Sequence, residues 1–259
     1  VVAGIDIGAL FTKTVILDDE QQIIAQGIVQ SGANSKKTAA ASFNMSLDSA
    51  GLKQSDIQFI VSTGYGRAIV DFSHAQVTEI SCHARGIHSI FPEVRTIIDI
   101  GGQDSKAIKI DEDGKVVNFV MNDKCAAGTG RFLEVMSQAL EIELGEMGKL
   151  SLHATREVPV SSTCTVFAES EVISLISSGE EKENILAGIH QSIARRTVGL
   201  VERIGVVQQV AMSGGVAKNI GVSKSIEALL NTKLQIADEP QLIGALGAAL
   251  VAHSRASYS

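Results

Sequence analysis

Several features that mark large classes of protein are missing from the sequence or scarce in it. Only three cysteines occur in 259 residues, and this odd number does not support a framework of disulfide bonds; metal binding, redox chemistry and simple burial remain as their roles. No apolar run approaches the roughly 18 residues of a membrane-spanning helix, so a membrane protein is not expected and the expected location is the cytoplasm. Lysine and arginine form no block, and the formal net charge is -7, which argues against nucleic acid as a partner.

Two common nucleotide-binding motifs are also absent. No G-x-x-x-x-G-K-[ST] occurs in the chain, and no G-x-G-x-x-G opens a helix after the first predicted strand. A P-loop ATPase and a dinucleotide-binding Rossmann domain are therefore disfavoured. The hydrophobic content, in contrast, is 45%, which is enough to build the core of one large domain or of two domains of ordinary size.

The sequence contains an internal repeat. "IDIGALFTK" at residues 5–13 and "IDIGGQDSK" at residues 98–106 share an Asp, a Gly, a hydroxyl residue and a Lys at the same offsets. Each copy continues into an apolar run and an acidic turn. Tight hairpin chemistry alone explains an Asp-x-Gly turn, so the repeat has a purely structural interpretation as well as a functional one.

The predicted secondary structure repeats in the same way. Short apolar runs between turn residues predict strands, and apolar residues at helical spacing predict helices. The predicted strands cover residues 1–7, 12–17, 23–29, 57–61, 96–100, 106–110, 115–120 and 207–212. The predicted helices cover residues 36–50, 79–91, 129–141, 166–178, 182–204 and 243–253. This order predicts a duplicated α/β fold with an N-terminal half at residues 1–95 and a C-terminal half at residues 96–259.

Glycine turns after three of these strands favour the functional interpretation of the repeat. Glycine allows backbone N–H groups to come close to phosphate oxygens. Two carboxylates, Asp6 and Asp99, are expected to hold a hydrated Mg²⁺ ion, because hard cations bind carboxylate oxygens. The two halves are therefore expected to hold one nucleotide between them. The glycines in question are Gly8, Gly101, Gly102, Gly214 and Gly215.

These motifs resemble those of the actin-like ATPase and sugar kinase superfamily, which has two duplicated ribonuclease H-like domains with the nucleotide between them. "DIGALFTK" is similar to the first phosphate motif, "DIGGQDSK" to the second, and "SGGVAKN" at residues 213–219 to the adenosine motif. One departure is Ala9-Leu10, where the family usually has a Ser-Thr pair. The resemblance implies that ATP or ADP contacts Asp6, Gly8, Ala9, Thr12, Lys13, Gly101, Gly102, Lys106, Gly214, Gly215, Lys218 and Asn219.

Four further motifs resemble a narrower family, the ATP-dependent activators of 2-hydroxyacyl-CoA dehydratases and of related benzoyl-CoA-reductase-type systems. They are "TGYGR" at residues 63–67, "EISCHARG" at 79–86, "NDKCAAGTGRF" at 122–132 and "SSTCTVFAESEVIS" at 161–174. With the repeat, the resemblance covers nearly the whole chain. The role of "TGYGR" does not follow from its residues.

The resemblance implies a 4Fe-4S cluster that bridges a homodimer through Cys125 and Cys164 of each chain. Both cysteines precede a predicted helix, and the partial positive charge and N–H groups of a helix N-terminus favour thiolates and an anionic cluster. Because one chain offers two such ligands, a cluster with four ligands needs a second chain. Burial as ordinary apolar residues is the alternative for both cysteines.

Cys82 and its histidine neighbours are interpreted as structural. Cys82 lies in an apolar-periodic segment, which favours burial. His83 and His88 are five positions apart, off the usual i, i+4 face of a helix, so they are interpreted as core or surface residues rather than metal ligands.

The implied activity is ATP hydrolysis that drives one electron from the cluster to a partner dehydratase or reductase with iron–sulfur clusters, of the 2-hydroxyacyl-CoA dehydratase type or a double-cubane cluster protein. A flavodoxin or a ferredoxin is the expected electron donor. By analogy with phosphoryl transfer, Asp99 and Asp104 position water or Mg²⁺ and Gln103 orients the attacking water. Lys13 and Lys106 offset phosphate charge.

Two other functions remain open at this stage. A small-molecule kinase of the same superfamily shares the nucleotide motifs, but its chemistry gives no role to Cys125 and Cys164 at helix starts. A non-catalytic module that binds nucleotide as a structural ligand is the second alternative.

Overall fold

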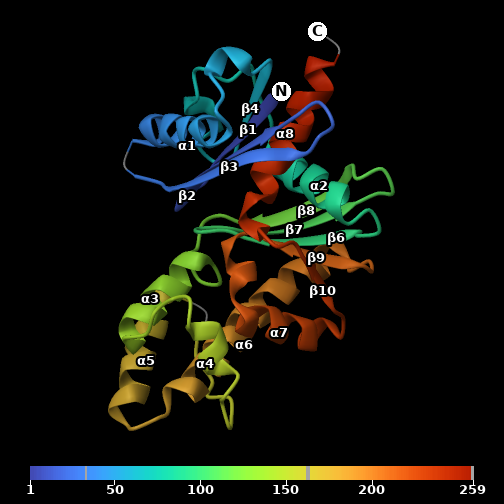
Figure 1. Cartoon of the computed structure of the whole chain (residues 1–259). Coiled ribbons are helices and arrows are strands. Elements are labelled where there is room, and N and C mark those ends of the chain that lie inside the picture. The colour runs from blue at the N-terminus through green and yellow to red at the C-terminus, as the bar shows by residue number, and fades with distance from the viewer. Residues whose placement is uncertain (33, 162–163, 258–259) are drawn as a thin grey trace. The chain divides into compact units, whose positions relative to one another are not determined.

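The computed structural model describes residues 1–32, 34–161 and 164–257, and Figure 1 shows the course of the chain. Contacts divide the chain into two compact units. The first unit comprises Val1–Val94, Ile110–Val117 and Ala237–Ser259, and the second comprises Arg95–Lys109 and Asn118–Ile236. The sequence-based division at residue 95 assigns the end of the chain to the C-terminal half. By contacts, the end of the chain belongs to the first unit, because its last helix packs on the first sheet.

The first unit is built on a mixed sheet of five strands. They are β1 (Val2–Ile7), β2 (Phe11–Leu17), β3 (Ile23–Gln30), β4 (Phe59–Thr63) and β5 (Ala75–Gln76). Their order across the sheet is β3-β2-β1-β4-β5, and β1 is antiparallel to β2 and parallel to β4. All residues of β1 are buried, as expected for a central strand whose two faces are both covered.

Helices cover both faces of this sheet. The helices of the first unit are α1 (Ser35–Ala50), α2 (Glu79–Ile90) and α8 (Ile243–Ala256), with short 3₁₀ turns η1 (Gln54–Asp56), η2 (Arg67–Ile69) and η4 (Pro240–Leu242). Ala3 and Ile5 belong to the apolar core that contains Phe43 of α1. Val2 belongs to the core that contains Leu246 of α8. Since successive residues of a strand face opposite sides, α1 and α8 lie on opposite faces.

The second unit repeats this arrangement. Its strands are β6 (Thr96–Ile100), β7 (Ser105–Ile110), β8 (Val116–Asn122), β9 (Val210–Ser213) and β10 (Leu234–Ile236), in the order β10-β9-β6-β7-β8. β6 is antiparallel to β7 and parallel to β9, as β1 is to β2 and β4. The predicted duplicated α/β fold is therefore confirmed.

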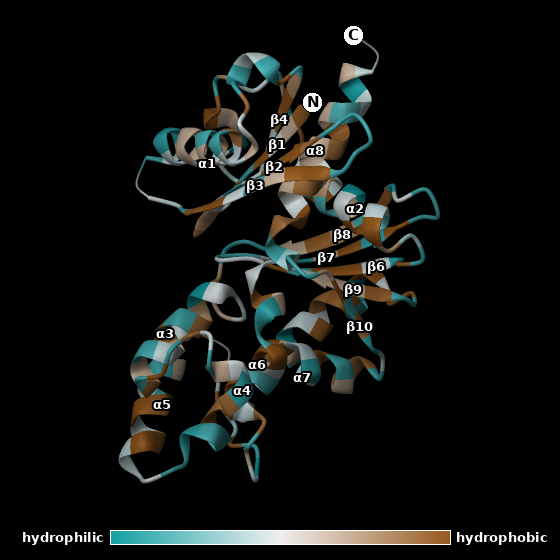
Figure 2. Ribbon diagram, viewed as in Figure 1, coloured by the Kyte–Doolittle hydropathy of each residue, from teal (hydrophilic) through white to brown (hydrophobic). Residues whose placement is uncertain are grey.

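Within the described residues, five α-helices accompany the second sheet. They are α3 (Gly130–Leu140), α4 (Met147–Ser151), α5 (Thr165–Ser177), α6 (Lys182–Ile204) and α7 (Ile220–Leu230), with the 3₁₀ turn η3 (Gly215–Lys218). α4, α6 and α7 pack together, and α3 packs on α5 (Figure 1). Figure 2 shows hydrophobic residues along α5, and among them Val166 and Phe167 are 64% and 69% exposed. No helix in the described parts of the chain has both the length and the apolar character required to cross a membrane.

Glycines allow α8 to approach its neighbours at backbone distance. A Cβ on Gly4 of β1 would lie 2.2 Å from the carbonyl oxygen of Ala245 in α8. A Cβ on Gly247 of α8 would lie 1.8 Å from the carbonyl oxygen of Cys82 in α2. Backbone atoms cannot move aside as a flexible side chain can, so β1, α2 and α8 depend on these missing side chains for their packing.

We expect Gly247→Ala to lower the free energy of unfolding by about 1–3 kcal/mol, the usual cost of overpacking a close-packed interior. Gly199→Ala in α6 is the matched control, because a Cβ there meets no atom within 4 Å. That control should raise stability by up to about 1 kcal/mol, since alanine is the better helix former. Urea unfolding of both variants checks the pair, and equal stabilities would contradict the backbone contact between α2 and α8.

Candidate functional site

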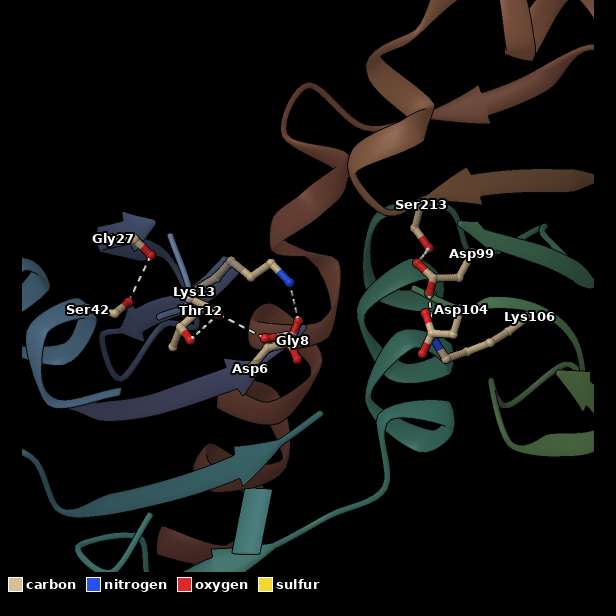
Figure 3. Close-up of polar contacts among 11 residues, drawn as sticks. Asp6, Gly8, Thr12, Lys13, Gly27, Ser42, Asp99, Asp104, Lys106 and Ser213 are labelled. Carbon is tan, nitrogen blue, oxygen red and sulfur yellow. Dashed lines mark hydrogen bonds and ion pairs between the residues drawn. The ribbon is translucent and has the colours of Figure 1, made fainter. Parts of the chain in front are cut away.

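The first repeat forms a hairpin with an ion pair beside its turn (Figure 3). Asp6 of β1 lies opposite Lys13 of β2, and the Lys13 ammonium donates to Asp6 Oδ2 at 2.9 Å. The N–H of Gly8 donates to the carbonyl of Phe11 at 3.1 Å and closes the turn. A Cβ on Gly8 would lie 3.0 Å from Lys13 Nζ, so the absence of a side chain makes room for the ammonium.

The second repeat forms the same pair in a more buried and more extended network. Asp99 of β6 lies opposite Lys106 of β7, whose ammonium is 3.0 Å from Asp99 Oδ2 and 2.9 Å from Asp104 Oδ1. The Ser213 hydroxyl donates to Asp99 Oδ1 at 2.9 Å (Figure 3). The side chains of Lys106 and Asp99 are only 2% and 3% exposed. The Lys106 cation thus offsets the charge of the buried Asp99 carboxylate and also contacts Asp104, whose side chain is 23% exposed.

The first carboxylate is enclosed by residues from two distant segments. A Cβ on Gly64, which has a φ of 86°, would lie 2.4 Å from Asp6 Oδ1, so the "TGYGR" loop packs directly on the carboxylate. On its other side, a Cβ on Gly244 of α8 would lie 3.0 Å from Asp6 Oδ2 and 3.1 Å from Nε2 of His83. His83 is buried. Of the two expected locations, core or surface, the structure places this residue in the core, beside Asp6.

Thr12 and Ala9, two predicted nucleotide contacts, lie in different environments. The Thr12 side chain is buried and its hydroxyl forms a 3.1 Å hydrogen bond with the hydroxyl of Ser31. Ser31 donates in turn to the carbonyl of Gly8 at 2.9 Å. Thr12 therefore supports the turn from within, whereas Ala9 is exposed at its tip. Ser31 lies outside both repeats, and sequence reasoning did not identify it.

The third glycine turn follows β9 and lies against the second carboxylate. Gly214 has a φ of 85°, and a Cβ on it would lie 2.9 Å from Asp99 Oδ1. Gly215 and Lys218 begin and end η3. Asn219 follows, and its Oδ1 accepts hydrogen bonds from the N–H groups of Gly221 and Val222 at 3.0 and 3.1 Å, which caps α7. The predicted adenosine motif thus forms a turn between Asp99 and the start of α7.

Backbone hydrogen bonds join the second turn to the segment that contains Cys125. The N–H of Gly130, the first residue of α3, donates to the carbonyl of Gly101 at 2.9 Å. The N–H of Arg131 donates to the carbonyl of Gly102 at 2.8 Å. The free N–H groups at the start of a helix need such acceptors. Gln103, the next residue of the turn, is exposed.

The three cysteines lie in two kinds of environment. Cys164 is the N-cap residue of α5, and Cys125 lies in the loop before Thr129, the N-cap residue of α3; both are half-buried. Two residues of the Cys164 motif, 162 and 163, lie outside the described residues. Cys82 is fully buried in α2, and burial raises the pKa of its thiol to about 12. A thiol with such a pKa stays protonated at neutral pH and is a poor metal ligand.

A buried histidine lies close to the turn at residues 214–219. His190 of α6 is 1% exposed, and its Nε2 is 3.3 Å from the amide nitrogen of Asn219. Burial lowers the pKa of His190 from 6.5 to about 4, so the imidazole is neutral in the folded protein at pH 7. Sequence reasoning did not select this residue, because a single histidine on a long helix carries no motif.

Comparison with known proteins gives one consistent family. The model of the BadF/BadG/BcrA/BcrD ATPase family matches residues 3–252. The activator of lactoyl-CoA dehydratase from Anaerotignum propionicum is 51% identical over 253 residues, which are 98% of this chain and 97% of the relative.

Two solved structures illustrate how far the likeness extends. The activator of 2-hydroxyisocaproyl-CoA dehydratase from Clostridium difficile, with bound ADPNP, superposes with a TM-score of 0.95 at 48% identity and covers 99% of this chain and 96% of its own. A ROK family glucokinase from Streptomyces griseus, in complex with glucose and AMPPNP, has a TM-score of 0.60 at 14% identity, covering 98% of this chain and 99% of its own. This second likeness concerns the fold alone, which is that of the actin-like and sugar kinase proteins.

We expect His190 to make the folded protein sensitive to acid. Its folded pKa of about 4 lies below its unfolded value of 6.5, so its contribution to stability is complete above pH 6.5 and is lost as the pH falls towards 4. The loss amounts to up to about 3 kcal/mol. Urea unfolding between pH 7 and pH 4 should therefore show a smaller decline for His190→Gln than for the unchanged protein; parallel declines would contradict a neutral buried imidazole.

We also expect Lys106→Met to destabilise the second unit, because it leaves Asp99 as a buried carboxylate without its cation. The expected cost is about 3–5 kcal/mol, as for other broken buried ion pairs. Lys13→Met is the matched control, since the Lys13 side chain is 15% exposed and water reaches its partner more easily. A Lys106→Met protein as stable in urea as the Lys13→Met protein would show that burial does not set the strength of these pairs.

Proposed function

The chain belongs to the BadF/BadG/BcrA/BcrD ATPase family, and from this premise we propose that it is the ATP-driven activator of a dehydratase or reductase that contains iron–sulfur clusters. The observation that carries the proposal is the pair of half-buried cysteines in the second unit, one in the loop before α3 and the other capping α5. Relatives that match nearly the full chain are activators of 2-hydroxyacyl-CoA dehydratases. We therefore assign this type of dehydratase as the partner.

The two hairpins have matching roles toward ATP in this proposal. The N–H groups of Gly8 and Gly101 already donate within their turns, so we assign the N–H groups of Ala9 and Gly102 to the phosphates. Glycine at four positions then allows the backbone to come close to the nucleotide; these are Gly8, Gly101, Gly214 and Gly215. Lys13 offsets phosphate charge, and so does Lys106, which at the same time holds Asp99 and Asp104 in place.

Asp6 and Asp99 are assigned to Mg²⁺, which supplies charge compensation for the phosphates when bound. Carboxylate oxygens suit this hard cation, and each aspartate is already oriented by a lysine. Asp104 and the exposed Gln103 lie in the second turn, where we assign them to the attacking water. Lys218 and Asn219 are assigned to the adenosine end of the nucleotide.

Cys125 and Cys164 are assigned as the ligands of a 4Fe-4S cluster, which when bound supplies a one-electron carrier. Their chemistry fits this role, because both thiols are partly exposed and neither is paired in a disulfide. In the described part of the chain no three His, Cys, Asp or Glu side chains are grouped to hold a metal ion. Two ligands from each of two chains make up the usual four, so we propose a homodimer.

The electron balance of the proposed cycle is simple. A flavodoxin or ferredoxin loses one electron, and the dehydratase or reductase gains it. ATP hydrolysis makes this transfer possible to an acceptor of low potential. The hydrogen bonds from α3 to Gly101 and Gly102 support the coupling, because a shift of the phosphate-binding turn moves the acceptors of the helix that follows Cys125. A small-molecule kinase would share the fold, yet it would leave Cys125 and Cys164 without a role.

We expect protein purified without oxygen to be a brown dimer with about two irons and two acid-labile sulfides per chain. Cys125→Ala and Cys164→Ala should each lose the iron, because a missing thiolate leaves the cluster incompletely held. Cys82→Ala is the matched control and should keep its iron, because this thiol is buried and protonated. Iron analysis together with the mass in solution tests all three variants.

Either of two results would contradict the proposal that a cluster bridges two chains. One is a brown monomer, and the other is iron-free protein that cannot be reconstituted with iron and sulfide. If the protein also converts ATP to ADP only when a small hydroxyl compound accepts the phosphoryl group, the kinase assignment replaces the activator.

A further inference from the structure

The adenosine turn is held from behind by a buried polar contact among three helices. His190 of α6, Asn219 at the start of α7 and Ser151 of α4 meet where these helices pack together. His190 is 1% exposed, and the only hydrogen bond recorded for its ring within the described residues joins Nε2 to Asn219 at 3.3 Å. This contact lies outside the carboxylate–lysine sites and needs its own explanation.

The direction of this hydrogen bond follows from the groups around it. Asn219 Oδ1 accepts from two backbone N–H groups, those of Gly221 and Val222. The amide oxygen is thereby directed at the helix start, and the NH₂ group is directed at His190. An NH₂ group can only donate, so Nε2 of a neutral imidazole accepts and the ring proton is on Nδ1. Burial keeps the imidazole neutral, as this arrangement requires.

The surrounding backbone packs closely around this contact. A Cβ on Gly221 would lie 2.2 Å from His190 Nδ1 and 2.5 Å from the Ser151 hydroxyl. A Cβ on Gly148 of α4 would lie 2.7 Å from Asn219 Oδ1. Nδ1 itself has no hydrogen-bond partner among the described residues. An apolar ring would pack at this position without the cost of desolvating Nδ1. A buried histidine with one unpartnered nitrogen therefore calls for a functional explanation.

Asn219 also ends the turn that starts at Gly214. The N–H of Asn219 donates to the carbonyl of Val216 at 2.9 Å. At the other end of the turn, Gly214 lies against Asp99. Asn219 therefore ends the turn through its backbone N–H, and its side-chain amide fixes where α7 begins.

We propose that His190 is a positioning residue for nucleotide binding: by accepting from Asn219 Nδ2 it holds the turn at residues 214–219 in the shape that receives the adenosine end of the nucleotide. This inference rests on the proposed function, which assigns that turn to adenosine. His190 itself does not touch the nucleotide. Its loss weakens the affinity for ATP and ADP and leaves the phosphate chemistry at the hairpins unchanged.

The test compares two substitutions at the same position in the intact dimer. His190→Leu removes the acceptor and leaves the Asn219 donor unpaired, whereas His190→Gln can place a carbonyl oxygen near the site of Nε2. Calorimetry with MgADP should give roughly a tenfold weaker affinity for His190→Leu. His190→Gln should stay within about threefold of the unchanged protein, because it restores a neutral acceptor.

Steady-state ATP hydrolysis supplies a second measurement. A purely structural role of His190 would not change KM and kcat in the way that a positioning role does. In His190→Leu, KM for ATP should rise while kcat at saturating ATP stays within about twofold, because the groups assigned to the reaction are untouched. Asn219→Asp tests the contact from its other side: it retains the oxygen that caps α7 and loses the donor, so it should weaken MgADP binding as His190→Leu does. If His190→Leu fails to fold, this variant keeps the inference falsifiable, because MgADP binding equal to that of the unchanged protein would contradict it.

The outcomes separate this inference from the proposed function. If the unchanged protein binds MgADP and both His190→Leu and Asn219→Asp bind it equally well, His190 is a packing residue and the inference is overturned. The same holds if His190→Gln binds as weakly as His190→Leu while both remain folded, because the acceptor is then not what matters. If the unchanged protein does not bind MgADP, the proposed function fails and this inference with it.

Discussion

A buried carboxylate at the end of a central strand, neutralised by a lysine on the neighbouring strand, is the interaction on which both units depend. Asp6 and Asp99 are 5% and 2% exposed, so each would be costly to bury without a cation. Their lysine partners lie directly opposite in the sheet register, at Lys13 and Lys106. The tight turn between the two strands of each hairpin brings the lysine back beside the aspartate. The repeat in the sequence therefore encodes the same aspartate–lysine ion pair twice. The glycines within the repeat leave space for the charged side chains.

In the second unit, hydrogen bonds join both the turn and the carboxylate to other segments of the chain. Its turn carbonyls accept from the first N–H groups of α3, and its carboxylate is also bound by Ser213 at the end of β9. The Cys125 loop, the Gly101 turn and the turn at residues 213–219 thus share one hydrogen-bonded network. The connection between α3 and the Gly101 turn consists of backbone groups that no side-chain motif encodes. The first unit instead encloses its carboxylate with the Gly64 turn and with His83.

Most of the fold followed from local patterns, and the exceptions have physical reasons. Each predicted strand and helix is present within a few residues of its expected bounds. Among the strands and α-helices of the described residues, β5, β10, α4 and α7 were not predicted. β5 and β10 are too short to show alternation, α4 has five residues, and Gly221, Ser223 and Ser225 interrupt the apolar spacing of α7. For the site, repeat and motif matching located the aspartates, lysines and glycines. Ser31, His83 and His190 were not recognised, because each acts through a partner far away in the chain.

By itself, the sequence determined the duplicated order of strands, the identical spacing of aspartate and lysine in both repeats, and the presence of cysteines ahead of two helices. These features depend on residues within about ten positions of one another, where spacing dictates geometry. Only the tertiary structure decided that α8 closes the first unit, that His83 lies beside Asp6 and that His190 orients Asn219. These contacts join segments that are distant in the chain. Their formation depends on which helix face meets which strand and on glycines that permit backbone contact, and no local pattern contains that information.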